Sequence, residues 1–284
     1  MPIYTLVADS GATKTEWRLL GTSRKKSLTT KGISPYYFSS QQITELVASE
    51  VAPWLASTMP QALHFYGTGC AVPANVKLVA LGLQKALPLV TQVHVSSDLV
   101  AAARALCGTQ KGVACILGTG SNSGVFNGKK ITRNNPAPGF ILGDEGSGAF
   151  LGKKVLQHFI YGTFDDELMH KFNLMYATDY RTILNHVYKQ PWPNRYLASF
   201  APFLSDNRGH YMIENILEDG LGEFFYNHLY KYPETWRYPI NFVGSVAWNF
   251  KDVLADLCNS FQLQLGKVLQ APMDGLAAFH APKQ

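Results

Sequence analysis

The 284-residue sequence lacks the features that mark membrane, secreted and zinc-binding proteins. No apolar run approaches the roughly 18 residues that cross a bilayer. The segment from Met1 to Ala8 has no basic stretch and meets Asp9 too early for a secretory signal. The four cysteines are scattered and include no CxxC pair, which favours free thiols in a reducing compartment. We therefore expect a soluble, cytoplasmic protein.

Strong charge of either sign is also missing. Lys and Arg number 25 against 20 Asp and Glu, so the formal net charge is +5, and no long basic stripe points to nucleic acid. A hydrophobic fraction of 46% excludes intrinsic disorder, and the length corresponds to about two domains. The eight histidines show no spacing that indicates a cluster, so we expect each of them at the surface or in the core.

Several well-known catalytic motifs are absent. The sequence contains no GxxxxGK[ST] P-loop, no GxGxxG that opens a helix and no GxSxG elbow. These absences argue against P-loop nucleotidases, dinucleotide-binding folds and α/β-hydrolases.

A repeated pattern of strand, glycine-rich loop and strand is present instead. Residues Ile3–Ala8 and Trp17–Leu20 flank a loop over Asp9–Thr15, and Val113–Leu117 leads into a second loop over Gly118–Gly124. The repeat suggests two domains of similar plan. Strands and helices alternate up to about residue 150, after which helical patterns dominate, so the sequence predicts an α/β fold.

The two glycine loops carry groups that suit phosphate. Glycine lets successive backbone N–H groups face one concavity, while Thr13, Thr15 and Lys14 add hydroxyls and positive charge. Asp9, at the end of the first strand, could hold Mg²⁺ through its waters. An ordinary polar hairpin turn is the alternative interpretation of each loop.

Two further segments offer carboxylates. Asp144 and Glu145 lie between glycines before an expected helix, where they could accept hydrogen bonds from sugar hydroxyls or simply remain solvated. Ser147 is expected near the N-terminus of that helix. Asp98 follows a short strand and is a candidate catalytic carboxylate. The alternative is that Asp98 is the N-cap of a helix that starts at Leu99, and the two roles can coexist.

Taken together, these segments resemble the signature of the actin-like, sugar-kinase and heat-shock ATPase superfamily. The resemblance covers, in order, the first phosphate loop, the first connecting segment, the second phosphate loop, the substrate loop and the adenosine loop, at Asp9–Thr15, Ser97–Asp98, Gly118–Asn122, Gly139–Gly148 and Gly244–Val246. A Gly-Asp-Glu-Gly-Ser string soon after Gly-Thr-Gly-Ser-Asn is similar to the N-acetylglucosamine kinase group, which shares a domain family with BadF-type activator ATPases.

The resemblance implies two ribonuclease-H-like α/β domains, residues 1–110 and 111–284, flanking a nucleotide- and sugar-binding cleft. It also implies that a last helix, about 272–284, packs back on the first domain. The implied activity is ATP-dependent phosphorylation of the 6-hydroxyl of an N-acetylated amino sugar, with Asp98 as general base. The residues implied for ATP and Mg²⁺ are Asp9 (also the metal, through water), Gly11, Thr13, Lys14, Thr119, Gly120, Ser121, Gly244 and Ser245. Those implied for the sugar are Ser34, Asn122, Gly139 and Asp144.

The chain departs from the family pattern on the sugar side. Pro138 and Phe140 stand where animal N-acetylglucosamine kinases have Trp and His, and Ser34 stands where Asn is frequent. Two other activities stay open for the fold. A BadF-type activator needs a cysteine pair for an iron–sulfur cluster, which the glycine loops here do not carry, and a non-catalytic sensor needs neither Asp9 nor Asp98. We expect small-molecule partners only, without nucleic acid or membrane, and leave open a homodimer.

Overall fold

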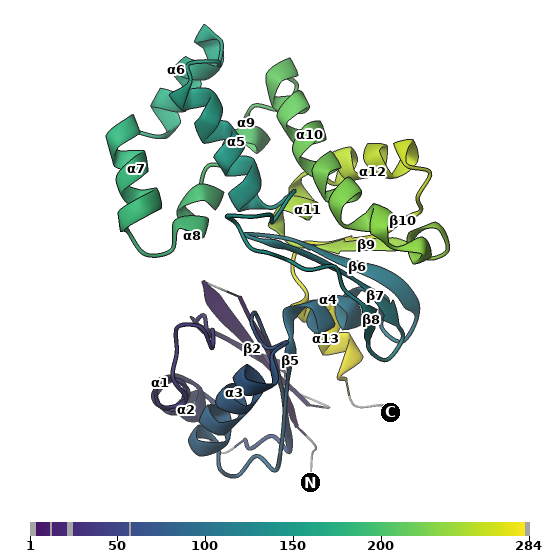
Figure 1. The fold of residues 1–284 in the computed structure, drawn as a ribbon. Helices are drawn as coiled ribbons and strands as arrows, with labels where there is room; N and C mark the ends of the chain where they lie inside the picture. Colours follow the sequence, from purple (N-terminus) through teal and green to yellow (C-terminus); the bar gives the residue numbers. More distant parts are fainter. Residues whose placement is uncertain (1–3, 12, 22–24, 57, 282–284) are drawn as a thin grey trace. The chain divides into compact units, whose positions relative to one another are not determined.

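The computed structural model describes residues 4–11, 13–21, 25–56 and 58–281. Ile3 of the expected first strand, Ala12 of the expected first loop and residues 282–284 of the expected last helix lie outside this range. The chain forms two compact units (Figure 1). Unit 1 comprises Met1–Thr109 and Ala271–Gln284, and unit 2 comprises Gln110–Gln270.

Unit 1 is built on a mixed five-stranded sheet. From edge to edge its strands are β3 (Lys25–Lys31), β2 (Lys14–Leu20), β1 (Thr5–Ser10), β4 (Ala62–Gly67) and β5 (Gln92–Ser97). Strands β1, β4 and β5 are parallel, whereas β2 and β3 return antiparallel to them. The carboxyl ends of three neighbouring strands therefore meet at one edge of the sheet, which is where open α/β sheets bind ligands.

Helices cover both faces of this sheet. They are α1 (Ser40–Leu46), the π-helical η1 (Val47–Val51), α2 (Ala52–Leu55), α3 (Pro73–Ala86), α4 (Asp98–Cys107) and α13 (Met273–Phe279). Leu6, Trp17 and Phe65 pack with Ile43 and Val79 under α1–α3, while α4 and α13 lie on the other side (Figure 1). A Cβ on Gly275 would lie 2.7 Å from Ala105 Cα, so glycine permits the close approach of α13 to α4.

Unit 2 repeats the same sheet. Its order is β10 (Leu265–Leu269), β9 (Ile240–Val243), β6 (Lys111–Leu117), β7 (Ser121–Asn127) and β8 (Ile131–Arg133). Strands β9 and β10 are parallel to β6, and β7 and β8 are antiparallel. The order β8-β7-β6-β9-β10 in unit 2 corresponds strand by strand to β3-β2-β1-β4-β5 in unit 1. This correspondence confirms the predicted pair of similar α/β domains.

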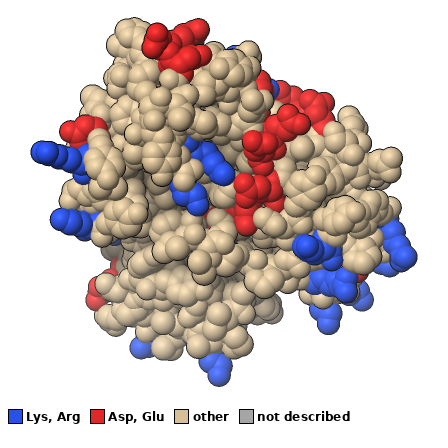
Figure 2. Space-filling view, turned by 45° about the horizontal axis from the view of Figure 1, so that its top comes forward, with Lys and Arg blue, Asp and Glu red and all other residues tan. Residues whose placement is uncertain are grey.

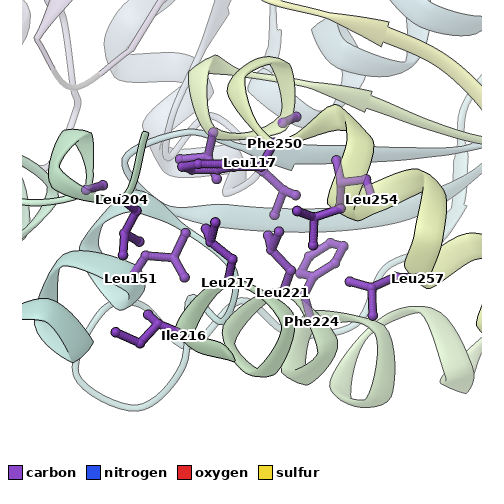
Figure 3. Packing of buried hydrophobic residues seen from close by; sticks show 14 of the residues in the cluster. Leu117, Leu151, Leu204, Ile216, Leu217, Leu221, Phe224, Phe250, Leu254 and Leu257 are labelled. Carbon is purple, nitrogen blue, oxygen red and sulfur yellow. The ribbon is translucent and has the colours of Figure 1, made fainter. Parts of the chain in front are cut away.

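Helices dominate the rest of unit 2, as predicted for the chain beyond residue 150. They are α5 (Gly148–Ile160), α6 (Asp166–Met175), α7 (Tyr180–Lys189), α8 (Pro193–Ala198), α9 (Pro202–Asp206), α10 (Tyr211–Asn227), α11 (Ser245–Asn249), α12 (Lys251–Ser260) and the 3₁₀ turns η2 (Leu229–Lys231) and η3 (Pro233–Trp236). Figure 3 shows Leu117 of β6 facing Leu151 of α5, Leu217 and Leu221 of α10 and Leu254 of α12. This apolar layer holds the sheet and its helices together.

The first hairpin strands are longer than the sequence predicts, and the structure contains three strands that the sequence did not predict. Strands β3, β8 and β10 were not predicted, and all three are edge strands, which need no continuous apolar pattern. The first loop is shorter than the predicted Asp9–Thr15, because Asp9 and Ser10 extend β1 and Lys14 and Thr15 open β2.

The surface agrees with the modest charge of the sequence. Figure 2 shows lysine and arginine side chains in several separate groups, with uncharged surface predominating on the side displayed. Within the described part of the chain, no helix is long and apolar enough to cross a bilayer. The four cysteines lie in the described part of the chain, and the structure places none of them in a disulfide.

Candidate active site

The carboxyl ends of β4 and β5 hold the candidate base of unit 1. Thr68, directly after β4, donates a hydrogen bond from Oγ1 to Oδ2 of Asp98 (2.9 Å). The backbone N–H of Leu99 donates to Oδ1 of Asp98 (2.8 Å). The helix cap predicted as an alternative role for Asp98 is wrong, because Ser97 is the N-cap of α4 and accepts from Val100 N. Asp98 is thus the first helical residue, with its carboxylate oriented by two donors.

Asp9 lies at the end of the neighbouring strand β1 and interacts electrostatically with Asp98. The pKa of Asp9 is raised to about 7, chiefly by burial and in addition by the nearby charges of Asp98 and Glu16, while Lys14 opposes the shift. Burial also raises the pKa of Asp98, although its hydrogen bonds with Thr68 and Leu99 oppose the shift. Two carboxyl groups that both resist ionisation form a site that a cation would stabilise.

The first hairpin loop presents its expected phosphate residues to solvent. Gly11 N–H donates to Lys14 O (3.0 Å), which closes the turn, and Gly32 N–H donates to Thr13 O (3.0 Å). Gly11, Thr13 and Lys14 are exposed, and the side-chain donors of Thr13 and Lys14 are available to a ligand, whereas the Gly11 N–H is already bonded within the turn.

Thr15 does not fit the phosphate role expected for its hydroxyl. Ser10 and Thr15 are buried, and their hydroxyl oxygens lie 2.7 Å apart. Thr15 Oγ1 donates to Lys31 O (3.1 Å), and Ile33 N–H donates to Ser10 Oγ (2.9 Å). These hydroxyls therefore tie the hairpin to the next segment. Ser34, expected on the sugar side, follows this tie and is itself buried.

In unit 2 the β6–β7 turn forms the second expected phosphate loop. The first turn of α5 is fixed to it, because Gly148 N–H donates to Gly118 O (2.8 Å) and Ala149 N–H to Thr119 O (3.1 Å). Among the described residues, Ser121 Oγ is buried yet has no hydrogen-bond partner. Buried polar atoms are normally paired, so the unpaired Ser121 hydroxyl is unusual.

The structure places Asp144 against the same turn. Its carboxylate lies so close to Gly120 that a Cβ there would be 3.0 Å from Oδ2, and Ser121 N–H points at Oδ1 (3.5 Å). Burial raises the pKa of Asp144 and the charge of Glu145 adds to it, while Ser121 N–H and Lys153 lower it. Two segments more than twenty residues apart in sequence thus form one polar cluster.

Asn122 and Gly139 complete the expected sugar residues of unit 2. Asn122 Oδ1 accepts from Asn134 Nδ2 (2.9 Å), and Gly139 O accepts from Gly143 N–H (2.8 Å) in a tight turn. Gly139 has a φ of +83° there, a conformation that favours glycine.

Gly244 and Ser245 lie beside the second phosphate loop. Gly244 has a φ of +132°, and a Cβ there would be 3.1 Å from Gly118 N and closer still to the carbonyl of Leu117. Ser245 begins α11 and is exposed. Unit 2 therefore brings three expected segments together at the ends of β6 and β9.

The expectation that the histidines form no cluster is wrong for three of them. The rings of His64 and His94, paired across β4 and β5, have centroids 4.7 Å apart, and His280 stacks on His64 at 4.0 Å. Burial lowers the pKa of His64 to about 4 and that of His280 to about 3. No group of three or more His, Cys, Asp or Glu that could hold a metal occurs in the described part of the chain.

Sequence reasoning also missed Thr68 and the partners of Glu145. The Gly-Thr-Gly string that follows β4 is a usable signal for Thr68, since the same string follows β6. Glu145 turns away from Asp144 toward Asn227 and His228, at distances of 3.1 and 3.3 Å. Nothing in the sequence indicates that the end of α10 meets this loop.

Comparisons with known proteins identify the family. Neither models of protein families nor curated proteins give a match. Among solved structures, a Porphyromonas gingivalis protein provisionally named an N-acetylglucosamine kinase is 36% identical, covers 97% of this chain and 98% of its own, and has a TM-score of 0.93. A Chromobacterium violaceum protein with the same provisional name is 18% identical over 98% of both chains, with a TM-score of 0.75. A ROK hexokinase from Thermus thermophilus is 14% identical over 98% of both chains, with a TM-score of 0.51. This likeness shows a shared fold alone. The chain belongs to the N-acetylglucosamine kinase and BadF-type ATPase family of the actin-like superfamily.

Proposed function

We propose that this protein is an ATP- and Mg²⁺-dependent kinase of an N-acetylated amino sugar, with N-acetylglucosamine as the first substrate to test. The 36% identical relative with its provisional name supports a sugar kinase. One observation within this chain carries the proposal furthest. The Asp98 carboxylate is held by Thr68 and Leu99 at the edge of the sheet where Asp9 also lies.

Asp98 acts as the general base in this proposal. A sugar hydroxyl is a poor nucleophile near neutral pH, so its proton must be accepted as its oxygen bonds to phosphorus. The γ-phosphoryl group passes to the 6-hydroxyl oxygen, the proton passes to Asp98, and ADP leaves. Burial raises the pKa of Asp98, which makes its carboxylate a better proton acceptor, and the two donors keep it oriented.

The residues around Asp9 fit a magnesium ion. Carboxylate oxygen is a hard ligand, and Mg²⁺ is commonly held by one or two carboxylates together with phosphate oxygens and waters. The pKa of Asp9, raised to about 7 by burial and by Asp98, shows a carboxylate without a sufficient counter-charge. When bound, the metal would neutralise charge on the transferring phosphates. Asp9 would hold it through water, while the exposed Lys14 would contact phosphate.

Unit 2 supplies the other contacts in this proposal. Thr119, Gly120 and Ser121 would bind the terminal phosphates, for which the unpaired Ser121 hydroxyl offers a donor. Gly244 and Ser245 would flank the nucleoside. Asp144 would bind ring hydroxyls, together with Asn122 and Gly139.

Coupled ADP release, measured with a panel of amino sugars, tests the proposal. We expect sugar-dependent ADP formation, and the product should carry phosphate on the 6-hydroxyl. Asp98→Asn should lower kcat by at least about 100-fold and change the ATP KM little, because general bases contribute about 10²–10⁴-fold. Sugar-independent ATP hydrolysis would instead favour an activator ATPase. Ligand binding without any ADP release would favour a sensor.

A further inference from the structure

The loop residues Asp144 to Ser147 are each held by a different part of unit 2. Asp144 faces the β6–β7 turn, and Ser147 caps α5 by accepting from Phe150 N–H (3.1 Å). Gly146, at a φ of +70°, packs so closely on α10 that a Cβ would lie 3.0 Å from Phe224 Cβ. The C-terminal part of α10 therefore packs directly against the loop.

Glu145 anchors the loop to the C-terminal end of α10. Asn227 Nδ2 donates to its Oε1 (3.1 Å), and His228 Nε2 lies 3.3 Å from its Oε2. The side chain of Glu145 is 15% exposed and that of His228 only 3%. A buried carboxylate needs such donors, since its desolvation is otherwise costly. The two acids of the motif thus have separate tasks, and only Asp144 faces the β6–β7 turn.

The hydrogen bonds of His228 have one consistent direction. Nε2 faces a carboxylate, which only accepts, so Nε2 carries the proton and Nδ1 accepts. Ser123 Oγ, 3.4 Å from Nδ1, is then the donor, and Tyr232 OH lies 3.0 Å from Ser123 Oγ. Burial lowers the pKa of His228 although Glu145 opposes the shift, which favours this neutral form.

The residues that follow α10 also bind Asn135, which lies at the start of the segment that leads to Asp144. Asn135 N–H donates to Tyr232 OH (2.6 Å), and Asn135 Nδ2 donates to His228 O (2.8 Å). Ser123, the other neighbour of His228, directly follows Asn122 in β7. His228 therefore connects Ser123 of β7, Asn135 and Glu145.

Asp144 needs such support. Its φ of +57° is a conformation that residues other than glycine rarely adopt, and it persists only where neighbours enforce it. The anchors lie on the residues that follow, Glu145, Gly146 and Ser147.

We propose that His228 is a positioning residue for sugar binding, which it supports by bridging Ser123 to Glu145 and so fixing the carboxylate of Asp144. The inference rests on the proposed sugar role of Asp144 and deepens it. His228 touches no reacting atom, and its effect reaches the sugar through Glu145 and the adjoining peptide.

Two variants separate this role from simple packing. His228→Phe keeps a flat ring that can stack on Phe224, as the imidazole does at a centroid distance of 4.8 Å, but removes both side-chain hydrogen bonds. His228→Gln keeps an amide donor for Glu145. We expect the Phe variant to raise the sugar KM about tenfold, with kcat at saturating sugar and the ATP KM within about twofold of wild type. The Gln variant should recover most of the loss. An unchanged sugar KM, or equal damage to kcat and to the ATP KM, would overturn the inference.

Hydrogen exchange provides a readout that does not depend on catalysis. The Gly143 N–H bonds to Gly139 O, and the Ser147 N–H bonds to Asp144 O (3.0 Å), so both report whether the loop is fixed. Exchange in the peptide 139–147 should be faster in His228→Phe than in wild type, and restored in His228→Gln. If wild type phosphorylates no amino sugar, the proposed function fails while this measurement still decides the anchoring. Equal exchange in the Phe variant and wild type would refute the anchoring.

Discussion

Thr68 Oγ1 donates a 2.9 Å hydrogen bond to Oδ2 of Asp98, so the residue that follows β4 orients the carboxylate that follows β5. The contact exists because β4 and β5 are parallel neighbours whose carboxyl ends coincide. A donor to the ionised form lowers the pKa of Asp98, against the increase that burial causes. Thr68 therefore affects both the position and the proton affinity of the proposed base.

Replacing Thr68 by valine removes this donor while keeping the shape of the side chain. We expect kcat to fall about tenfold, because a hydrogen bond to a charged group contributes about 1.5–3 kcal/mol and this one is exposed. The pKa of Asp98 should rise, so the acidic limb of the kcat–pH profile should move to higher pH. Steady-state kinetics across pH test this, with Thr68→Ser as the control that keeps the hydroxyl. An unshifted acidic limb would contradict the role.

The hairpins and several chemical segments could be predicted because local signals specify them. Glycine loops between short β-branched runs marked the β1–β2 and β6–β7 turns, and Ser147 was expected near the start of α5, which it caps. Edge strands such as β3 carry too few apolar residues to be recognised. The pattern that occurs twice indicated two domains of similar plan, but it did not predict the order of the strands.

Contacts between distant segments could not be predicted from one sequence. The bond from His228 to Glu145 spans 83 residues, and no local pattern reports it. His64 and His94 face each other only because β4 and β5 pair in one particular register. The role of Thr15 was misjudged for the same reason, since its partner Lys31 lies on the next strand.

Asp9 should destabilise the fold at alkaline pH. Its pKa is raised from 3.8 to about 7, so between these values the folded state binds the proton more tightly than the unfolded state. The stability that this proton gives is present below about pH 4 and is lost as the pH rises through 7. Asp9→Asn, which mimics the protonated form, should therefore raise the free energy of unfolding at pH 8 by about 2 kcal/mol, a figure reduced for the partial exposure of the side chain.

Urea unfolding of wild type and Asp9→Asn at pH 8 and pH 4 measures this difference. The gain at pH 8 should nearly vanish at pH 4, and kinase turnover should be mostly lost at either pH while nucleotide binding remains measurable. Asp219→Asn serves as a control, because this carboxylate is exposed on α10. A stability gain that is equal at both pH values would show that charge is not its cause.

The stacked histidines should make unit 1 sensitive to acid. The pKa of His64 is lowered from 6.5 to about 4, chiefly by burial and then by His94 on β5 and Arg104 on α4, while His280 stacks on it from the end of α13. For a base with a lowered pKa, the full stability is present above pH 6.5 and is lost as the pH falls toward 4. His64→Phe should reduce this loss by about 2 kcal/mol, again discounted for partial exposure.

Unfolding curves between pH 7 and pH 4 test the histidine prediction. The slope of stability against pH should be shallower in His64→Phe, because phenylalanine stays neutral throughout. His170→Gln, at an exposed position on α6, should leave the slope unchanged. Parallel slopes in wild type and His64→Phe would exclude His64 as the source.

Asp144 should act on sugar binding, and its neighbour Gly120 offers a way to move it without removing it. Asp144→Asn removes the charge and should raise the sugar KM more than it lowers kcat, the reverse of Asp98→Asn. A Cβ on Gly120 would lie 3.0 Å from Asp144 Oδ2, so Gly120→Ala displaces the carboxylate by a few tenths of an ångström and should raise the sugar KM several-fold. A Cβ on Gly118 meets no atom within 4 Å, so Gly118→Ala should leave the sugar KM unchanged. Steady-state kinetics with each substrate varied in turn decide the matter. A severe loss of kcat in Asp144→Asn together with a mild one in Asp98→Asn would exchange the roles of the two acids.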